Sequence, residues 1–352
     1  MPASLIICDD SNLARKQLAR SLPDNFDMEI HFAANGIEAV DALRKGLGDI
    51  MFLDLNMPEM DGYEVLQAIR DEDLNSMVIV VSGDIQPEAR KRVKALGAVE
   101  FIKKPIDIER LQEVMLDYGL VDEIIKQPAQ SKATSKPKQK SATKQISSAL
   151  QDKNFHVNFL DCYQEITNVG MGQAADLLAK MLGVFVSLPV PNVNIIEVSE
   201  IHMALTLADD EKASAVCQGF IGRGIAGEAI LIFNDAGIEC IAKLMDHKGE
   251  IDDCIERELV MDISNILIGA CLNGIGKQLN INFSQGHPLI LGQHKRVSSM
   301  IKANTNRWKK TLAIEVNYTI SNADITCDLL LLFTEDSLET LNSLVSYLLD
   351  DE

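Results

Sequence analysis

The sequence is short of basic residues, and it has neither a long apolar run nor an N-terminal leader pattern. It contains 33 lysines and arginines against 52 aspartates and glutamates, a formal net charge of -19. This balance argues against a nucleic-acid partner, because phosphate backbones are bound by positive surfaces. No uninterrupted apolar stretch approaches the ~20 residues that span a bilayer. We therefore predict a cytoplasmic protein with no membrane segment.

The sequence also lacks any CxxC pair and any cluster of histidines at ligand spacing. Its seven cysteines are an odd number, and unpaired thiols are typical of a reducing compartment. The six histidines are scattered along the chain, so we predict no zinc site. What remains is a composition with 47% hydrophobic and 24% charged residues, ordinary for a globular protein, and a length sufficient for two domains.

A change of composition after about residue 120 divides the chain. No acidic residue occurs from Ile124 to Gln151, where six lysines stand among Ser, Thr, Gln and Ala. Such a stretch is too polar to bury a core and is typical of a disordered linker. We therefore predict a domain at residues 1–122, a basic linker at 123–151, and a second domain at 152–352.

The first domain alternates short apolar runs with amphipathic segments. The expected strands are Leu5–Cys8, Ile30–Ala33, Ile50–Leu53, Val78–Val81 and Val99–Ile102. The expected helices are near 12–22, 37–46, 62–72, 86–96 and 107–117. Five strand–helix alternations with right-handed crossovers predict a doubly wound α/β fold around a five-stranded parallel sheet.

Polar residues stand where these strands end. Asp9 and Asp10 follow the first strand, and Asp54 ends the third. Ser82 ends the fourth strand, and Lys104 ends the fifth. Ligands of open α/β sheets bind at the carboxyl ends of the strands, so we expect these side chains to share one crevice. Three carboxylates packed together attract a hard cation, and Mg²⁺ beside Asp54 would let that carboxylate accept a phosphoryl group.

The motifs around these residues resemble the receiver domain of two-component response regulators. They are the pair Asp9–Asp10, Asp54 in FLDLNMPEMDG, Ser82 in VVSGD, and Lys104–Pro105 in FIKKP. The resemblance implies phosphorylation of Asp54 by a histidine kinase and a cis peptide bond before Pro105. The alternative is a degenerate receiver that serves only as a dimerisation platform, and receivers often form homodimers.

The same resemblance assigns roles to individual residues. It implies that Mg²⁺ is bound by Asp9, Asp54 and the backbone carbonyl of Asn56, with Asp10 reaching it through water. It also implies that Ser82 moves toward the phosphoryl group, that Lys104 supplies a positive charge, and that Phe101 occupies an aromatic switch position.

The second domain carries an internal repeat. Long amphipathic segments near 160–182 and 253–278 are each followed by strand-like stretches, of which Ala226–Phe233 and Leu329–Phe333 are the clearest. The order of helix, strands and helix recurs at an offset near 97 residues, which predicts an α+β domain built by duplication.

Each repeat begins with an acid and an asparagine three residues apart. Glu165 and Asn168 form the first pair, and Asp262 and Asn265 form the second. In both copies a proline follows after 22 further residues. Residues three apart project from one helix face, which we expect to be exposed. An amide oxygen on that face can orient a water for in-line attack on phosphorus.

The layout resembles the CheC/CheX/FliY family of chemotaxis phosphatases. The first copy matches the family signature through Asp161, Glu165, Asn168 and Pro191. The second departs from it, because Asp262 stands where Glu is usual and is one methylene shorter. The resemblance implies a pseudo-two-fold domain that hydrolyses the phospho-aspartate of a CheY-like protein.

Three arrangements of the two domains follow. Phosphorylation of Asp54 can switch a phosphatase that acts on a separate receiver. The second domain can instead dephosphorylate Asp54 of its own chain, or it can act only as a receiver-binding adaptor.

Overall fold

The computed structural model describes residues 3–23, 26, 28–121, 157–197, 212–295, 310–320 and 325–349. The expected linker at 123–151 lies outside these residues. The chain forms two compact units, which are described separately.

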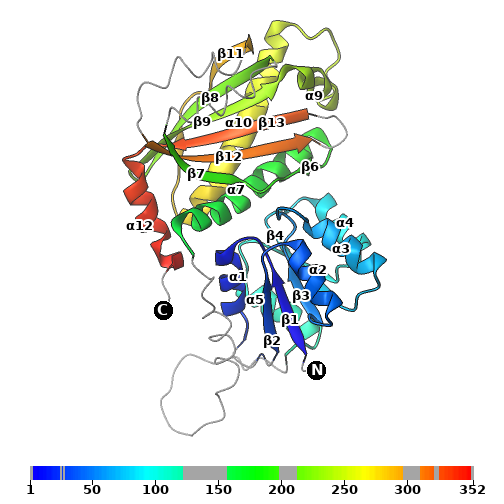
Figure 1. The fold of residues 1–352 in the computed structure, drawn as a ribbon. Helices are drawn as coiled ribbons and strands as arrows, with labels where there is room; N and C mark the ends of the chain where they lie inside the picture. The colour runs from blue at the N-terminus through cyan, green and yellow to red at the C-terminus, as the bar shows by residue number, and fades with distance from the viewer. Residues whose placement is uncertain are drawn as a thin grey trace. The chain divides into compact units, whose positions relative to one another are not determined.

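The first unit is a parallel sheet with helices on both faces (Figure 1). All five strands run parallel, in the order β2-β1-β3-β4-β5. The strands are β1 (Ser4–Cys8), β2 (Glu29–Ala33), β3 (Ile50–Leu53), β4 (Met77–Ser82) and β5 (Glu100–Lys103). The helices are α1 (Asn12–Arg20), α2 (Gly36–Arg44), α3 (Gly62–Asp71), α4 (Pro87–Ala95) and α5 (Ile108–Asp117). The predicted five-stranded parallel sheet is confirmed.

Alternation along the strands builds two cores, one on each face of the sheet. On β1, Ile6 and Cys8 belong to a cluster that includes apolar residues of α2, α3 and α4. Leu5 and Ile7 belong to the other cluster, which includes residues of α1 and α5. Because both faces are covered, β1 is buried along its whole length, as a central strand of a parallel sheet should be.

The second unit is an antiparallel sheet flanked by helices. Its strand order is β10-β8-β9-β13-β12-β6, with β11 also paired to β8 and β7 also paired to β12. Its first half contains α7 (Phe159–Leu182), β6 (Val186–Ser187), β7 (Asn192–Glu197), β8 (Ala213–Gly222), β9 (Ile225–Asn234), the 3₁₀ turn η1 (Asp235–Gly237) and α9 (Ile238–Leu244). Its second half contains α10 (Asp253–Leu279), β10 (Ser284–Gln285), β11 (Leu289–Lys295), β12 (Lys310–Ile320), β13 (Ile325–Phe333) and α12 (Ser337–Leu349).

The two halves have the same order of elements, and their strands pair across the halves. Strand β7 of the first half pairs with β12 of the second, while β11 of the second half pairs with β8 of the first. Strands β9 and β13 pair antiparallel at the centre of the sheet. Exchanging the two halves therefore leaves this set of pairings unchanged, which is the topology expected of a duplicated unit.

Helices α7 and α10 pack against each other through glycines. A Cβ added at Gly274 would lie 2.6 Å from the Cα of Gly170, so only glycines permit this approach. Helix α7 begins with a capping box between Asn158 and Asp161, and it ends at Gly183 in the left-handed conformation. Asp161, which the sequence places in the signature, therefore has a structural role at the start of the helix.

Helix α10 is the one described helix that is long and apolar enough to span a bilayer. Of its most apolar 18-residue segment, 67% is buried inside the protein, as is typical of a core helix. Its apolar character is therefore accounted for by the packing of the second unit.

Candidate functional site

The carboxyl ends of β1 and β3 bring three carboxylates together in the first unit. Three carboxylate oxygens, one each from Asp9, Asp10 and Asp54, lie within 4.8 Å of one another. Asp9 and Asp54 are buried, at 6% and 3% exposure. The backbone N–H of Asn56 donates to Oδ2 of Asp54 over 3.1 Å, which holds that carboxylate in place. The sequence-predicted acidic cluster is therefore present.

Lys104 balances this negative charge. Its Nζ lies 2.8 Å from Oδ2 of Asp9 and 3.5 Å from Oδ1 of Asp54, and its side chain is only 3% exposed. The Lys104–Pro105 bond is cis, as the sequence motif predicts. The backbone N–H of Lys104 also donates to the carbonyl of Ser82, which joins β5 to the end of β4. Ser82 is fully buried at this point.

The donor set fits a hard divalent cation. Three carboxylates supply the oxygen ligands that Mg²⁺ prefers, and it commonly completes its shell with water. Asp9, Asp10 and Asp54 would hold the ion, which would neutralise the charge that develops on transferred phosphoryl oxygens. Lys104 contributes a positive charge beside Asp9 and Asp54.

Arg15 is a residue of this site that the sequence reasoning missed. Its guanidinium donates to the backbone carbonyl of Asp9 and to the side chain of Asn12. Burial lowers the pKa of Arg15, while the carboxylates of Asp9 and Asp10 oppose that shift. The available signal was the position of Arg15 on the first turns of α1, directly after the acidic pair.

Phe101 is buried at 7% exposure and belongs to the core cluster on the α2–α4 side of the sheet. The guanidinium carbon of Arg90 on α4 lies 5.0 Å from the centre of its ring. The expected switch residue therefore lies in an inward position, with a cation over its face.

The second unit places the two acid–asparagine pairs at equivalent positions of α7 and α10. Asp262 and Asn265 on α10 are exposed, as predicted. Glu165 and Asn168 on α7 are buried, at 9% and 3% exposure, where the sequence led us to expect an exposed pair. The spacing fixes which residues share a helix face, but it does not fix what lies over that face.

The amide of Asn168 is notable for its missing hydrogen bonds. Neither its Oδ1 nor its Nδ2 has a hydrogen-bond partner in the structure, although both atoms are buried. A buried polar group left unsatisfied costs roughly 1–3 kcal/mol, so such groups in native proteins are rare and call for an explanation.

A hydroxyl precedes each asparagine and fixes its helix in the same way. Thr167 donates to the carbonyl of Tyr163 over 2.7 Å, and Ser264 donates to the carbonyl of Val260 over 2.6 Å. Both hydroxyl residues are fully buried. The two copies therefore share a buried contact as well as a spacing, and this second match was readable in the sequence at the same offset.

Helical geometry places both asparagines away from the contact between α7 and α10. Asn168 is two residues before Gly170 and so lies about 200° around the helix from it. Asn265 is nine residues before Gly274, about 180° around α10. Each amide therefore belongs to a face that the packing of the helix pair does not use.

Comparison with known proteins identifies the first unit. Residues 5–116 match the response regulator receiver domain family. A protein-glutamate methylesterase/protein-glutamine glutaminase from Rhodospirillum rubrum is 37% identical over 119 residues, which are 32% of this chain and 32% of that protein. The chain thus spans about a third of that relative.

Two further likenesses differ in extent. The polar-differentiation response regulator DivK of Brucella anthropi is 32% identical over 34% of this chain and 97% of its own length. The crystal structure of FliY from Thermotoga maritima covers 54% of this chain and 96% of that chain, at 19% identity and a TM-score of 0.41. Since 97% of DivK is covered at 32% identity, the chain belongs, through its first unit, to the response regulator receiver family.

Proposed function

We propose that this chain is a response regulator whose second unit hydrolyses the aspartyl phosphate of a CheY-like receiver. The single observation that carries the proposal is the repeated acid–asparagine pair on the two packed helices α7 and α10. The sequence signature of the CheC/CheX/FliY phosphatases supports the same assignment for the α+β unit. The pathway served is chemotaxis or another two-component system.

The first unit supplies the regulatory phosphorylation in this proposal. A carboxylate oxygen of Asp54 attacks the phosphorus of a histidine kinase's phosphohistidine, and the P–N bond breaks. Lys104 lies between Asp9 and Asp54 and stabilises the charge of the product. Bound Mg²⁺ supplies further charge neutralisation on the phosphoryl oxygens.

The second unit supplies a water-positioning amide. The oxygen of Asn168 or Asn265 accepts a hydrogen bond from a water and directs it in line at the phosphorus of a partner receiver. The water oxygen bonds to phosphorus, the aspartyl oxygen leaves as a carboxylate, and inorganic phosphate is released. Glu165 or Asp262 pairs with the partner's lysine, the counterpart of Lys104 in this chain.

The two copies have different properties in favour of activity. The first has the longer acid, Glu165, and a buried amide at Asn168 whose hydrogen-bonding groups are unused. The second has Asp262 and Asn265 exposed on α10, where a partner can reach them directly. The shorter Asp262 side chain loses about 1 Å of reach, and errors of that size can cost about 10²-fold in rate.

The alternative is an adaptor that binds a receiver without hydrolysing its phosphate. The experiment that separates the two follows the loss of label from a separately supplied, phosphorylated CheY-like receiver after addition of the full-length chain carrying Asp54→Ala. If the chain is an enzyme, it accelerates the loss of label at substoichiometric concentrations. The double variant Asn168→Ala, Asn265→Ala should then lower the accelerated rate by about 10²-fold. The single variants assign the active copy.

Asn273→Ala provides a matched control, because Asn273 is an exposed asparagine on the same helix α10. It should leave the rate unchanged. If the wild-type second unit produces no acceleration while still binding the phosphorylated receiver, the adaptor assignment replaces the enzyme.

Action on the chain's own Asp54 is a separate arm of the same experiment. Here the full-length chain with Asp54 intact is phosphorylated, and its dephosphorylation is compared with that of the Asn168→Ala, Asn265→Ala double variant. A longer phosphate lifetime in the double variant indicates self-directed hydrolysis. Equal lifetimes restrict the activity to a separate receiver.

A further inference from the structure

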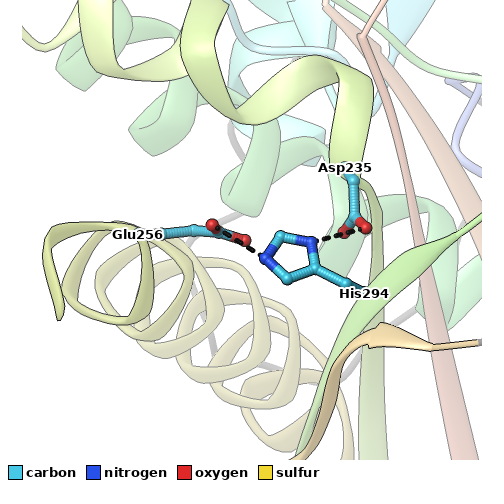
Figure 2. Close-up of side chains that lie close together, drawn as sticks. All are labelled: Asp235, Glu256 and His294. Carbon is cyan, nitrogen blue, oxygen red and sulfur yellow. Dashed lines mark hydrogen bonds and ion pairs between the residues drawn. The ribbon is translucent and has the colours of Figure 1, made fainter. Parts of the chain in front are cut away.

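A histidine in the second unit lies between two carboxylates that come from other parts of the sequence. Figure 2 shows the ring of His294 with Asp235 on one side and Glu256 on the other. Nδ1 of His294 is 2.8 Å from Oδ2 of Asp235, and Nε2 is 3.3 Å from Oε2 of Glu256. The sequence predicted scattered histidines, and the fold instead gives this one two partners.

Four elements meet at this cluster. His294 is on β11, Asp235 begins the turn η1 after β9, and Glu256 is in the first turn of α10. Ser214 on β8 is fully buried, and its hydroxyl lies 2.9 Å from Oδ1 of Asp235 and 3.5 Å from Oε1 of Glu256. Oδ1 of Asp235 and Oε1 of Glu256 thus lie near the serine hydroxyl, whereas Oδ2 and Oε2 lie near the ring of His294.

The position of the ring decides which protonation state the cluster accepts. A neutral imidazole has one N–H donor and one acceptor nitrogen. Its acceptor nitrogen would therefore face a carboxylate oxygen, which is also an acceptor, and no hydrogen bond could form there. The imidazolium has two donors and satisfies both Asp235 and Glu256. Its charge also separates two carboxylates that would otherwise repel each other at short range.

We propose that protonated His294 is a clasp that fastens β11 to the end of β9 and to the first turn of α10, and that loss of the proton releases this edge of the sheet. The backbone of β11 departs from regular strand geometry at this contact. The register of its pairing with β8 shifts between Gly292 and Lys295, and His294 adopts a positive φ of 53°. The shift takes His294 out of the regular ladder, and Figure 2 shows its ring lying between the two acids.

A divalent metal is a poorer occupant for this geometry. A metal ligated by His294 must lie along the lone pair of one ring nitrogen, and both carboxylates would have to converge there. Asp235 and Glu256 instead face different nitrogens, on opposite sides of the ring (Figure 2). The cation that fits between them is the imidazolium itself.

The charged groups around the ring favour the proton. Hydrogen bonding to Asp235 is the largest influence and raises the pKa of His294 from its ordinary value. Burial opposes that shift, and the charges of Glu256, Asp235 and Asp253 add to the hydrogen bond. On β8 the neutral Ser214 faces the cluster. Two exposed cations are near it: Lys212, whose backbone carbonyl accepts from the N–H of Asp235, and Lys295, which follows His294 on β11.

The sign of the linkage follows from this direction. A histidine whose folded-state pKa is raised stabilises the fold fully below its unfolded pKa, near 6.5, and the contribution is lost as pH rises through the folded-state pKa. The clasp is therefore closed in mildly acidic solution and opens toward alkaline pH. It is independent of the proposed phosphatase activity.

The direct test is a titration of the full-length chain labelled with ¹⁵N-histidine, with the His294 signal assigned by its loss in His294→Gln. We expect a midpoint above the ordinary value of 6.5, with N–H signals from both ring nitrogens below it. Asp235→Asn and Glu256→Gln should each lower the midpoint. Asp246→Asn, a change at an exposed carboxylate paired with Lys248, should leave it unchanged. A midpoint at or below 6.5 in the wild type overturns the proposal.

Hydrogen exchange supplies the structural readout. At each pH, protection of the β11 amides is compared between the wild type and His294→Gln. Because both proteins are measured at the same pH, the comparison removes the intrinsic pH dependence of exchange. We expect greater protection in the wild type below the midpoint and equal protection above it. Equal protection of the two proteins at every pH would contradict the proposed clasp. Stoichiometric Zn²⁺ binding that is lost in all three of His294→Gln, Asp235→Asn and Glu256→Gln would identify a metal site instead.

Discussion

The guanidinium of Arg90 lies over the ring of Phe101, with its central carbon 5.0 Å from the ring centre. Arg90 is exposed on α4, whereas Phe101 on β5 is buried. Cation–π contacts at exposed sites contribute roughly 0.5–1 kcal/mol, which corresponds to a factor of about 2–5 in a conformational equilibrium. The contact therefore favours the inward position of Phe101.

We expect Arg90→Ala to raise the outward population of Phe101 by about 2–5-fold, since the ring loses the cation over its face. Fluorine NMR of the full-length chain with fluorophenylalanine at position 101 measures the two populations. Arg92→Ala is the matched control, because Arg92 is on the same helix but lies over Tyr63, 4.6 Å from its ring centre. An Arg90→Ala spectrum identical to wild type would contradict the prediction.

Asp54→Asn should abolish phosphorylation by a small phosphodonor such as acetyl phosphate, because the amide cannot serve as the nucleophile. Intact-mass spectrometry counts the phosphoryl groups acquired by the full-length chain in Mg²⁺. Asp117→Asn removes an exposed carboxylate on α5 and should label like the wild type. Removing Mg²⁺ with a chelator should also prevent labelling, and label on Asp54→Asn would show that the phosphoacceptor is misassigned.

Lys104→Met should make the stability of the first unit depend strongly on Mg²⁺. Without the lysine, buried Asp9 and Asp54 have lost their nearest positive charge, a change that costs about 3–5 kcal/mol for a broken buried pair. A bound cation can replace part of that charge. Thermal unfolding with and without Mg²⁺ should show a larger rise in Tm for Lys104→Met than for wild type.

Lys103→Met is the control for the lysine change, because Lys103 is the exposed last residue of β5, directly before Lys104. It should show the Mg²⁺ response of the wild type. If Lys104→Met gains no more from Mg²⁺ than Lys103→Met does, the cation and the lysine do not share the site.

Gly274→Ala should destabilise the second unit by about 1–3 kcal/mol, because the added Cβ would meet the Cα of Gly170 at 2.6 Å. Gly269→Ala on the same helix is the control, since its nearest neighbour would be a side-chain atom of Gln285 at 3.6 Å. This change should be neutral or stabilising by roughly 0.5–1 kcal/mol, through helix propensity. Denaturant unfolding of both variants measures the difference, and equal stabilities would mean that α7 and α10 do not approach this closely.

Thiol labelling should distinguish the cysteines by position. Cys254 is exposed, whereas Cys8, Cys162, Cys271 and Cys327 are buried. Burial also raises the pKa of Cys271 to about 12, so its thiolate is scarce at neutral pH. A thiol reagent under native conditions should show a fast phase that disappears in Cys254→Ser, and no modification at Cys271. Rapid labelling of Cys271 would contradict the packing of α10.

The first unit could be predicted closely from the sequence, because its strands are buried apolar runs with distinct ends. All five strands and five helices begin and end within two residues of the expected positions. In the second unit the two long helices were found, but the expected strand Leu329–Phe333 begins at Ile325 in the structure. Residues such as Thr326 and Asp328 interrupt the apolar pattern there while still pairing with β12.

The candidate site shows the same limit. The strand ends predicted the grouping of Asp9, Asp54 and Lys104, since parallel strands deliver their last residues to one edge. The meeting of His294 with Asp235 and Glu256 was not predictable, because the three residues are far apart in the sequence and His294 lies at a register shift of β11. A helical spacing likewise could not reveal that Asn168 is buried while Asn265 is exposed.

The crossed strand pairing of the second unit has an evolutionary consequence. Each half lends an outer strand to the other, β7 to β12 and β11 to β8, so a single half would leave strand edges without partners. An ancestral gene encoding one half could satisfy those edges by associating with an identical copy. Gene fusion gives one chain whose two halves are free to differ, and here the equivalent helix positions carry Glu165 and Asp262.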